Sequence, residues 1–265
     1  MKEIASGDNI EAYRFVNLLV EKMHAVLGKN LTGLYLHGSL ALGGFQDHSS
    51  DIDLIGITEE PMAKGDAEKL TMMLLAYSAH PFPVEISFLN KNQLTDWVHP
   101  SRFDFHFSEQ WRNYFESQVS EFNAFIFQDM KDEDLAAHLK VINHRGICLL
   151  GTPINEVFPL IPDRHYVSSI LGDFRSCLEN IEREPVYCTL NMLRVYRYLR
   201  DYQISSKLEA GKWAQDHLPE VYKETIQLVI NRYLLVNNNK EIATEELTFL
   251  KEHIKAKTKK LISRY

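Results

Sequence analysis

Cysteines and long apolar runs are scarce in this chain of 265 residues. Its three cysteines are Cys148, Cys177 and Cys188, and no two of them have the Cys-x-x-Cys spacing of zinc or redox motifs. Neither a disulfide framework nor a structural zinc site is expected, and the thiols should be reduced, buried apolar groups in a cytoplasmic protein. No apolar run approaches membrane-spanning length, and residues 1–8 contain no apolar signal core.

Positive charge is also in short supply. The chain has 29 Lys and Arg against 36 Asp and Glu, for a formal net charge of -7. A protein that binds nucleic acid through its phosphates normally carries a basic stripe, so we expect neither a nucleic acid nor a membrane partner. The excess of acid suits a cationic small molecule, although many other enzymes are equally acidic.

The pattern of apolar residues divides the chain into a mixed front and a helical back. Alternating or continuous apolar runs predict strands, and apolar residues at helical spacing predict helices. The front has predicted helices at 9–27 and 62–79 and predicted strands at 31–37, 51–57 and 84–89. After about Phe103 the strand signal fades, and helices are predicted at 132–145, 167–183, 186–202, 207–217, 220–235 and 244–263. Residues 150–163, with three prolines, are the expected link.

The stretch LYLHGSLALGGFQDHSSDIDLIGIT, residues 34–58, raises a chemical question. Asp51 and Asp53 are two apart in a predicted strand, so they share one face while Ile52 and Leu54 point into the core. Two carboxylates on one face repel unless one is protonated or a cation lies between them. Carboxylate oxygens suit Mg²⁺, and the exposed N–H groups of a Gly38-Ser39 turn suit phosphate oxygens.

Glu85 interrupts the third predicted strand and completes a possible three-carboxylate centre. Such centres bind two metal ions and support in-line displacement at phosphorus. A lone Gly-Ser, a lone Asp-x-Asp or a lone strand glutamate is common as a turn or edge-strand feature. The joint order of strand, Gly-Ser, Gly-Gly, Asp-Ile-Asp on a strand and Glu on a third strand favours the functional interpretation.

These motifs resemble a known family. The GS and SDIDL segments look like the signature of the nucleotidyltransferase superfamily related to DNA polymerase β. The blocks FHFSEQWRNYF, LLGTPINEVFP, TLNMLRVYRYL and ISSKLEAGKWAQDHLP resemble blocks, in the same order, of the bacterial aminoglycoside 3''- and 9-O-adenylyltransferases, which inactivate streptomycin and spectinomycin. The resemblance implies an α+β fold, with a polymerase β-like nucleotidyltransferase domain over residues 1–155 and a helical bundle domain over 156–265.

The resemblance also implies roles for particular residues. Asp51 and Asp53 would bind two Mg²⁺ ions, and Glu85 would be the catalytic base that also contacts the acceptor. For the nucleotide, the matching residues are Gly38, Ser39, Ser50, Arg194 and Lys207.

Seen without the resemblance, two of these assignments have simpler alternatives. Arg194 belongs to a polar and aromatic stripe with Tyr187, Asn191 and Tyr198, which is also compatible with a solvated helix face. Lys207 follows Ser206, which opens a capping box with Glu209. Because a cation is unfavourable at a helix N-terminus, Lys207 hints at another purpose.

Three further positions come from the resemblance and have an equally ordinary explanation. Trp111 matches a tryptophan that lines the drug site, but it could equally be a core tryptophan. Glu184 lies near an acidic drug contact, and Tyr233 matches a tyrosine near the adenine, where a helical core contact is the simpler explanation. Relatives that use streptomycin have a tryptophan and an aspartate near positions occupied here by Arg175 and Asn180, which favours spectinomycin.

The sequence therefore predicts an enzyme that transfers AMP from ATP to a hydroxyl of a cationic, aminoglycoside-type antibiotic, giving resistance and releasing pyrophosphate. Its expected state is a cytoplasmic monomer. Two alternatives remain open: a nucleotidyltransferase acting on a protein, an RNA or an unknown small acceptor, and a ligand-binding relative without turnover. A complete Asp/Asp/Glu set speaks against the latter.

Overall fold

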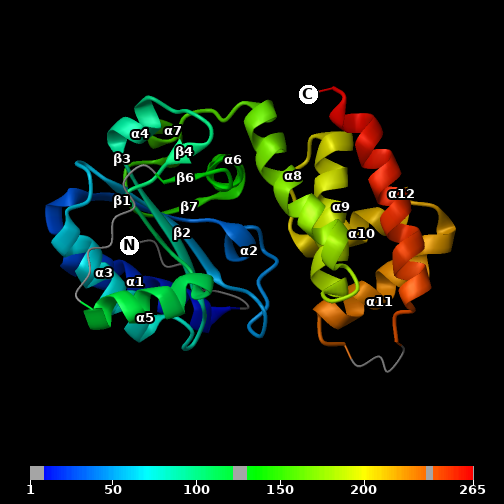
Figure 1. Ribbon diagram of the computed structural model, residues 1–265, viewed down its shortest axis with the longest axis horizontal. Coiled ribbons are helices and arrows are strands. Elements are labelled where there is room, and N and C mark those ends of the chain that lie inside the picture. The colour runs from blue at the N-terminus through cyan, green and yellow to red at the C-terminus, as the bar shows by residue number, and fades with distance from the viewer. Residues whose placement is uncertain (1–8, 122–129, 237–240, 265) are drawn as a thin grey trace. The chain divides into compact units, whose positions relative to one another are not determined.

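The computed structural model describes residues 9–121, 130–236 and 241–264. Residue contacts divide the chain into two compact units, Met1–Ile161 and Pro162–Tyr265, which Figure 1 shows coloured along the sequence. The boundary after residue 155, inferred from the sequence, stays a prediction.

The first unit is organised around a mixed sheet. Its strand order is β5-β3-β2-β1-β7, where β2 and β3 are parallel and the other neighbours are antiparallel. The strands are β1 (Leu31–Leu36), β2 (Ile52–Thr58), β3 (Val84–Asn90), β5 (Phe105–Phe107) and β7 (Ile147–Gly151). A second, two-stranded sheet pairs β4 (Ser101–Arg102) with β6 (Lys131–Asp132).

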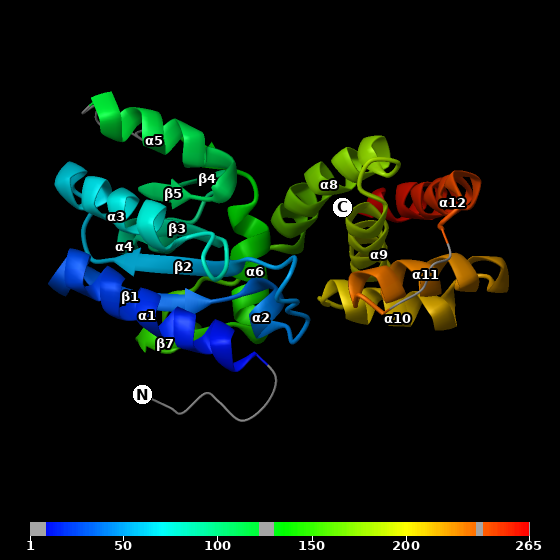
Figure 2. The same cartoon turned by 90° about the horizontal axis from the view of Figure 1, so that it is seen from below.

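Helices cover both faces of this sheet. Helices α1 (Ile10–Leu27), α3 (Lys64–Tyr77) and α5 (Arg112–Glu121) lie side by side on one face, and α6 (Leu135–Arg145) lies on the other (Figures 1 and 2). The core between the layers includes Leu19 and Met23 of α1, Leu54 of β2 and Leu139 of α6. Shorter elements complete the unit: η1 (Gly28–Asn30), α2 (Gly38–Ala41), α4 (Lys91–Thr95), η2 (Glu109–Trp111) and α7 (Ile154–Val157).

Two strands of the sheet contradict the expectation that strand signals end near Phe103. Strand β5 is only three residues long, too short for a period-two pattern to stand out, although Phe105 and Phe107 are fully buried. Strand β7 pairs with β1, so residues 150 and 151 of the predicted link belong to the sheet. Since β7 is an edge strand, Cys148 is exposed, and its predicted burial is wrong; Cys177 and Cys188 are buried as predicted.

The second unit is helical, as predicted. Its helices are α8 (Asp163–Asn180), α9 (Pro185–Asp201), α10 (Lys207–His217), α11 (Lys223–Tyr233) and α12 (Thr244–Ile262), with η3 (Glu220–Tyr222) before α11. Helix α9 packs against each of the other four, which explains why most of its residues are buried. Within the residues that the structure describes, no helix combines the length and apolarity required to cross a bilayer.

Two features predicted from the sequence of this unit, the capping box of α10 and the polar stripe of α9, can be compared with the structure. The capping box at α10 is present, with Ser206 Oγ accepting from the Glu209 N–H and the Glu209 carboxylate accepting from the Ser206 N–H. The stripe of α9 is solvated only at its start, where Tyr187 is exposed. Asn191 and Tyr198 are buried, and the Tyr198 hydroxyl donates to Asp163 of α8 at 3.0 Å. The polar stripe therefore packs against α8.

Candidate active site

The Gly-Ser turn and strand β2 meet at very close range. Gly38 has a φ of +60°, in the left-handed region, and a Cβ built on it would lie 1.6 Å from Oδ2 of Asp53. The Ser39 N–H donates to this same Oδ2 at 3.3 Å, and the His37 N–H donates to the Asp53 carbonyl at 3.0 Å. Only glycine lets the first turn of α2 approach the carboxylate this closely.

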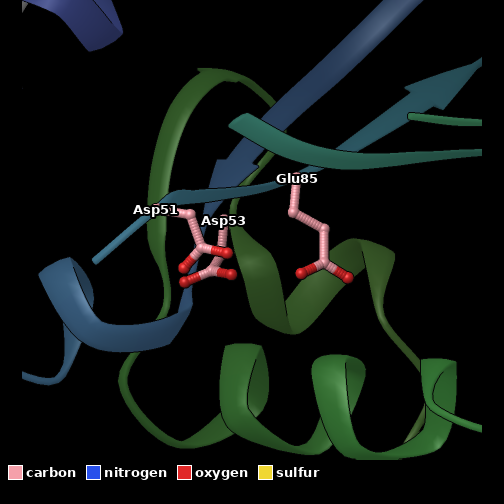
Figure 3. Close-up of side chains that lie close together, drawn as sticks. All are labelled: Asp51, Asp53 and Glu85. Carbon is pink, nitrogen blue, oxygen red and sulfur yellow. The ribbon is translucent and has the colours of Figure 1, made fainter. Parts of the chain in front are cut away.

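Three carboxylates gather at the ends of β2 and β3. Asp53 is directly opposite Glu85 in the parallel register, so their side chains leave the sheet on the same face. Asp51, the first residue of the predicted strand, lies one position before the observed start of β2 and still points the same way (Figure 3). Each of the three residues offers one oxygen within 4.8 Å of the others, and all three are half-buried.

The electrostatics of this cluster favour a bound cation. Burial raises the pKa of Asp53 well above its usual range, with further contributions from Asp51 and Glu85. Burial also raises the pKa of Glu85 to about 7, helped by Asp51, Asp132 and Asp134. Protonation and cation binding are the two ways to relieve such crowding, and an all-oxygen donor set suits Mg²⁺.

The two serines predicted to bind phosphate differ in their surroundings. The Ser39 hydroxyl is buried and has no hydrogen-bond partner among the described residues, so it fits the binding of a phosphate oxygen at the turn. The Ser50 hydroxyl accepts from the Gln46 N–H at 3.0 Å and so closes the loop before Asp51. Ser50 therefore has a structural role whether or not it also contacts phosphate.

Helix α6 contributes one residue, His138, that the sequence analysis did not find. The His138 ring is tilted by 37° against the His37 ring, with centroids 4.9 Å apart, and its electrostatic interaction with Asp53 offsets part of the rise in the pKa of that carboxyl. Burial and the neighbouring His138 lower the pKa of His37 well below its usual range, so His37 is neutral at pH 7. No sequence signal connects these residues, because His138 is far along the chain and occupies an ordinary helical position.

Two of the predicted nucleotide residues in the second unit are joined by a network. Arg194 donates to Oδ1 of Asn191 at 3.3 Å, and the Lys207 ammonium lies 4.4 Å from the centre of the Tyr187 ring. Both Asn191 and Tyr187 bond to Asp173 of α8, a residue that the sequence analysis did not single out.

The remaining predicted residues have ordinary surroundings. Trp111, at the end of η2, packs edge-on against Tyr114 and is 38% exposed. Glu184 occupies the N-cap of α9 without a side-chain cap bond, and its carbonyl accepts from the Cys188 N–H. Tyr233 is buried near the end of α11. Their proposed roles toward ligands stay predictions.

Comparison with known proteins gives consistent results. Residues 156–259 match the family model of the aminoglycoside adenylyltransferase C-terminal domain. A spectinomycin 9-adenylyltransferase of Staphylococcus aureus is 24% identical over 214 residues, covering 78% of this chain and 80% of the relative. One from Campylobacter jejuni is 23% identical over 253 residues, covering 93% of this chain and 95% of the relative.

The fold has a solved counterpart. A spectinomycin adenyltransferase of Enterococcus faecialis, crystallised with ATP and spectinomycin, superposes with a TM-score of 0.77 at 20% identity. The match covers 93% of this chain and 99% of that one. The fold and the relatives together define the class of the protein as a nucleotidyltransferase, with an N-terminal nucleotidyltransferase domain and a helical C-terminal domain. Its C-terminal unit is similar to the aminoglycoside adenylyltransferase C-terminal domain, and the chain is similar over most of its length to the spectinomycin 9-adenylyltransferases.

Proposed function

We propose that this protein transfers AMP from ATP to a hydroxyl of an aminoglycoside-type antibiotic, with spectinomycin favoured over streptomycin, and so confers resistance in the cytoplasm. The observation that carries the proposal is the register of Asp53 with Glu85, with Asp51 beside them and the Gly38-Ser39 turn in contact with Asp53. The acceptor class follows from the relatives, which are spectinomycin adenylyltransferases.

The residues around the Gly38-Ser39 turn are suited to binding a nucleoside triphosphate. The N-terminus of α2 offers N–H donors to phosphate oxygens, and so does the Ser39 hydroxyl, which has no hydrogen-bond partner in the part of the chain that the structure describes. Asp51 and Asp53 would hold Mg²⁺. When bound there, Mg²⁺ would orient the triphosphate and stabilise the charge that develops on the leaving pyrophosphate.

Glu85 would serve as the base. The acceptor hydroxyl oxygen attacks the α-phosphorus in line, the bond from this phosphorus to the bridging oxygen breaks, and pyrophosphate leaves with its electron pair. Glu85 takes the proton of the attacking hydroxyl. The Glu85 carboxylate is half-buried beside the two carboxylates that would hold Mg²⁺, which supports this role.

Residues outside the carboxylate cluster are also proposed to contact the two ligands. Arg194 and Lys207 would bind the nucleotide, and Tyr233 would contact its adenine. Trp111 and Glu184 would contact the cationic acceptor, whose approach the net charge of -7 favours.

Mass spectrometry of drug mixtures tests the proposal. Spectinomycin, streptomycin and other aminoglycosides would be incubated with the protein, ATP and Mg²⁺, with Asp53→Asn and a chelator-treated sample as controls. We expect an AMP-sized mass gain on spectinomycin and equimolar pyrophosphate, both absent from the controls. No gain on any drug while ATP still binds would refute the acceptor class and leave a macromolecule or another small molecule as the acceptor.

A further inference from the structure

Asp173 of α8 lies at the centre of a polar network within the helical unit. The Tyr187 hydroxyl, on α9, donates to both Asp173 oxygens, at 3.3 and 3.2 Å. Burial and the Asp173 carboxylate raise the pKa of Tyr187, so the hydroxyl keeps its proton and remains a donor. Asp173 therefore fixes the direction of the Tyr187 side chain, which is otherwise 40% exposed.

The same carboxylate also holds Asn191. The Asn191 side-chain N–H donates to Oδ2 of Asp173, which leaves its Oδ1 oxygen facing Arg194 as an acceptor. An amide whose nitrogen is bonded to a carboxylate can present only its oxygen to a guanidinium group. Asp173 thus determines which end of the buried Asn191 side chain meets Arg194.

The network reaches the second cation through the Tyr187 ring. The ammonium group of Lys207 lies 4.4 Å from the ring centre, within the range of a cation–π interaction. Tyr187, Asn191 and Arg194 are at helical spacing on α9, while Lys207 begins α10. One carboxylate is consequently connected to both Arg194 and Lys207, each through one intermediate side chain.

We propose that Asp173 is a positioning residue for nucleotide binding, which orients Arg194 through Asn191 and Lys207 through Tyr187. This inference rests on the proposed function, in which the two cations bind ATP. The donors to the Asp173 carboxylate include the Tyr187 hydroxyl and the Asn191 amide, both of them neutral groups.

The direction in which the dissociation constant of ATP changes distinguishes a positioning role of Asp173 from a purely electrostatic one. A negative charge near a polyphosphate site weakens binding of the anion, so removing the charge of Asp173 would strengthen ATP binding if charge were its only contribution. If Asp173 positions the cations, its removal weakens ATP binding, because two long side chains must then be ordered when the nucleotide binds. The two mechanisms predict opposite changes in the dissociation constant.

The experiment compares Asp173→Asn, Tyr187→Phe and the control Glu179→Gln, which removes one negative charge from an exposed position of the same helix. Isothermal titration would give Kd for ATP with Mg²⁺, and steady-state assays would give separate KM values for ATP and spectinomycin. We expect Asp173→Asn to raise Kd and KM for ATP about tenfold and to leave KM for spectinomycin within about twofold. Tyr187→Phe, which keeps the ring under Lys207, should raise Kd and KM for ATP about threefold. Glu179→Gln should leave Kd and KM for ATP unchanged.

Reference variants separate the possible failures. If Arg194→Ala and Lys207→Ala bind ATP like the wild type, the proposed nucleotide role of these residues fails and the inference falls with it. If they weaken ATP binding while folded Asp173→Asn binds ATP as tightly as the wild type or more tightly, the positioning role alone is refuted. If Asp173→Asn does not fold, Tyr187→Phe decides, because unchanged ATP binding in that variant also overturns the proposal.

Discussion

Replacing Gly38 by alanine perturbs the candidate site through one methyl group. The new Cβ would be 1.6 Å from Oδ2, 2.3 Å from Cγ and 2.8 Å from Cβ of Asp53, where real Cβ atoms essentially never approach closer than 3.0 Å. The carboxylate oxygen must move by about 1.4 Å to reach that limit. Rotation of the Asp53 side chain is not enough, because its Cβ is also too close.

Two effects follow, and they have different sizes. A left-handed φ costs an alanine roughly 1–2 kcal/mol of stability, which a protein of this size can tolerate. Displacing a reacting or metal-binding group by about 1 Å costs on the order of 100-fold in rate. Gly38→Ala should therefore fold with a moderately lowered melting temperature and lose about 100-fold or more in kcat/KM for adenylyl transfer.

Gly43→Ala is the matched control for this prediction. Gly43 has a φ of +72°, and a Cβ built there meets nothing within 4 Å. Both variants thus have similar backbone strain, but only Gly38→Ala clashes with Asp53. Thermal melts followed by circular dichroism and spectinomycin adenylylation rates would be measured for both. Comparable activity in the two variants would refute the argument that Gly38 exists to admit the Asp53 carboxylate.

Three other outcomes are expected. Glu85→Gln should bind ATP normally and lose about 100-fold or more in transfer rate; retained transfer would exclude Glu85 as the base. Ser206→Ala should lower the free energy of unfolding by about 1 kcal/mol, whereas Ser205→Ala, whose buried hydroxyl has no hydrogen-bond partner in the described residues, should change it little; equal losses in denaturant melts would contradict the cap's contribution. Arg112→Ala removes the ion pair with Glu109 and hydrogen bonds to two carbonyls, costing about 2 kcal/mol at pH 7. Because Arg112 lowers the pKa of Glu109 from its usual 4.5, the ion-pair part of this difference is present above that value and should disappear as the pH falls through the lowered pKa; a pH-independent difference would contradict it.

The centre of the candidate site could be predicted because its chemistry is local in sequence. Asp51 and Asp53 stand two apart around a strand start, and Glu85 alternates with the buried Val84 and Ile86. Period-two alternation predicts which side chains share a face of the strand, and the repulsion between carboxylates on one face explains why they would bind a cation. The structure adds the parallel register that brings Glu85 opposite Asp53, which alternation within single strands does not determine.

Other parts of the fold leave a weaker trace in the sequence. Strand β7 lies at the sheet edge and is half-buried along most of its length, and its apolar run, residues 147–150, is only four residues long. A run this short does not distinguish a strand from a buried helical segment by its periodicity. The position of His138 beside Asp53 depends on where α6 crosses the sheet. This is a tertiary property, because the pattern of α6 predicts only its apolar face.

Asp173 shows most clearly where sequence reasoning ends. From the sequence, α9 shows a polar and aromatic stripe that fits either a solvated face or a ligand site, and Lys207 is a cation at an unfavourable helix N-terminus. Packing α8 against that stripe supplies a third explanation, in which a carboxylate satisfies Tyr187 and Asn191 and they in turn hold the two cations. The unfavourable position of Lys207 is compensated by the Tyr187 ring, and the ring is fixed by Asp173. A residue with no motif of its own can thus determine whether two predicted binding residues are ready for a ligand, because orientation arises between helices and is not encoded within one.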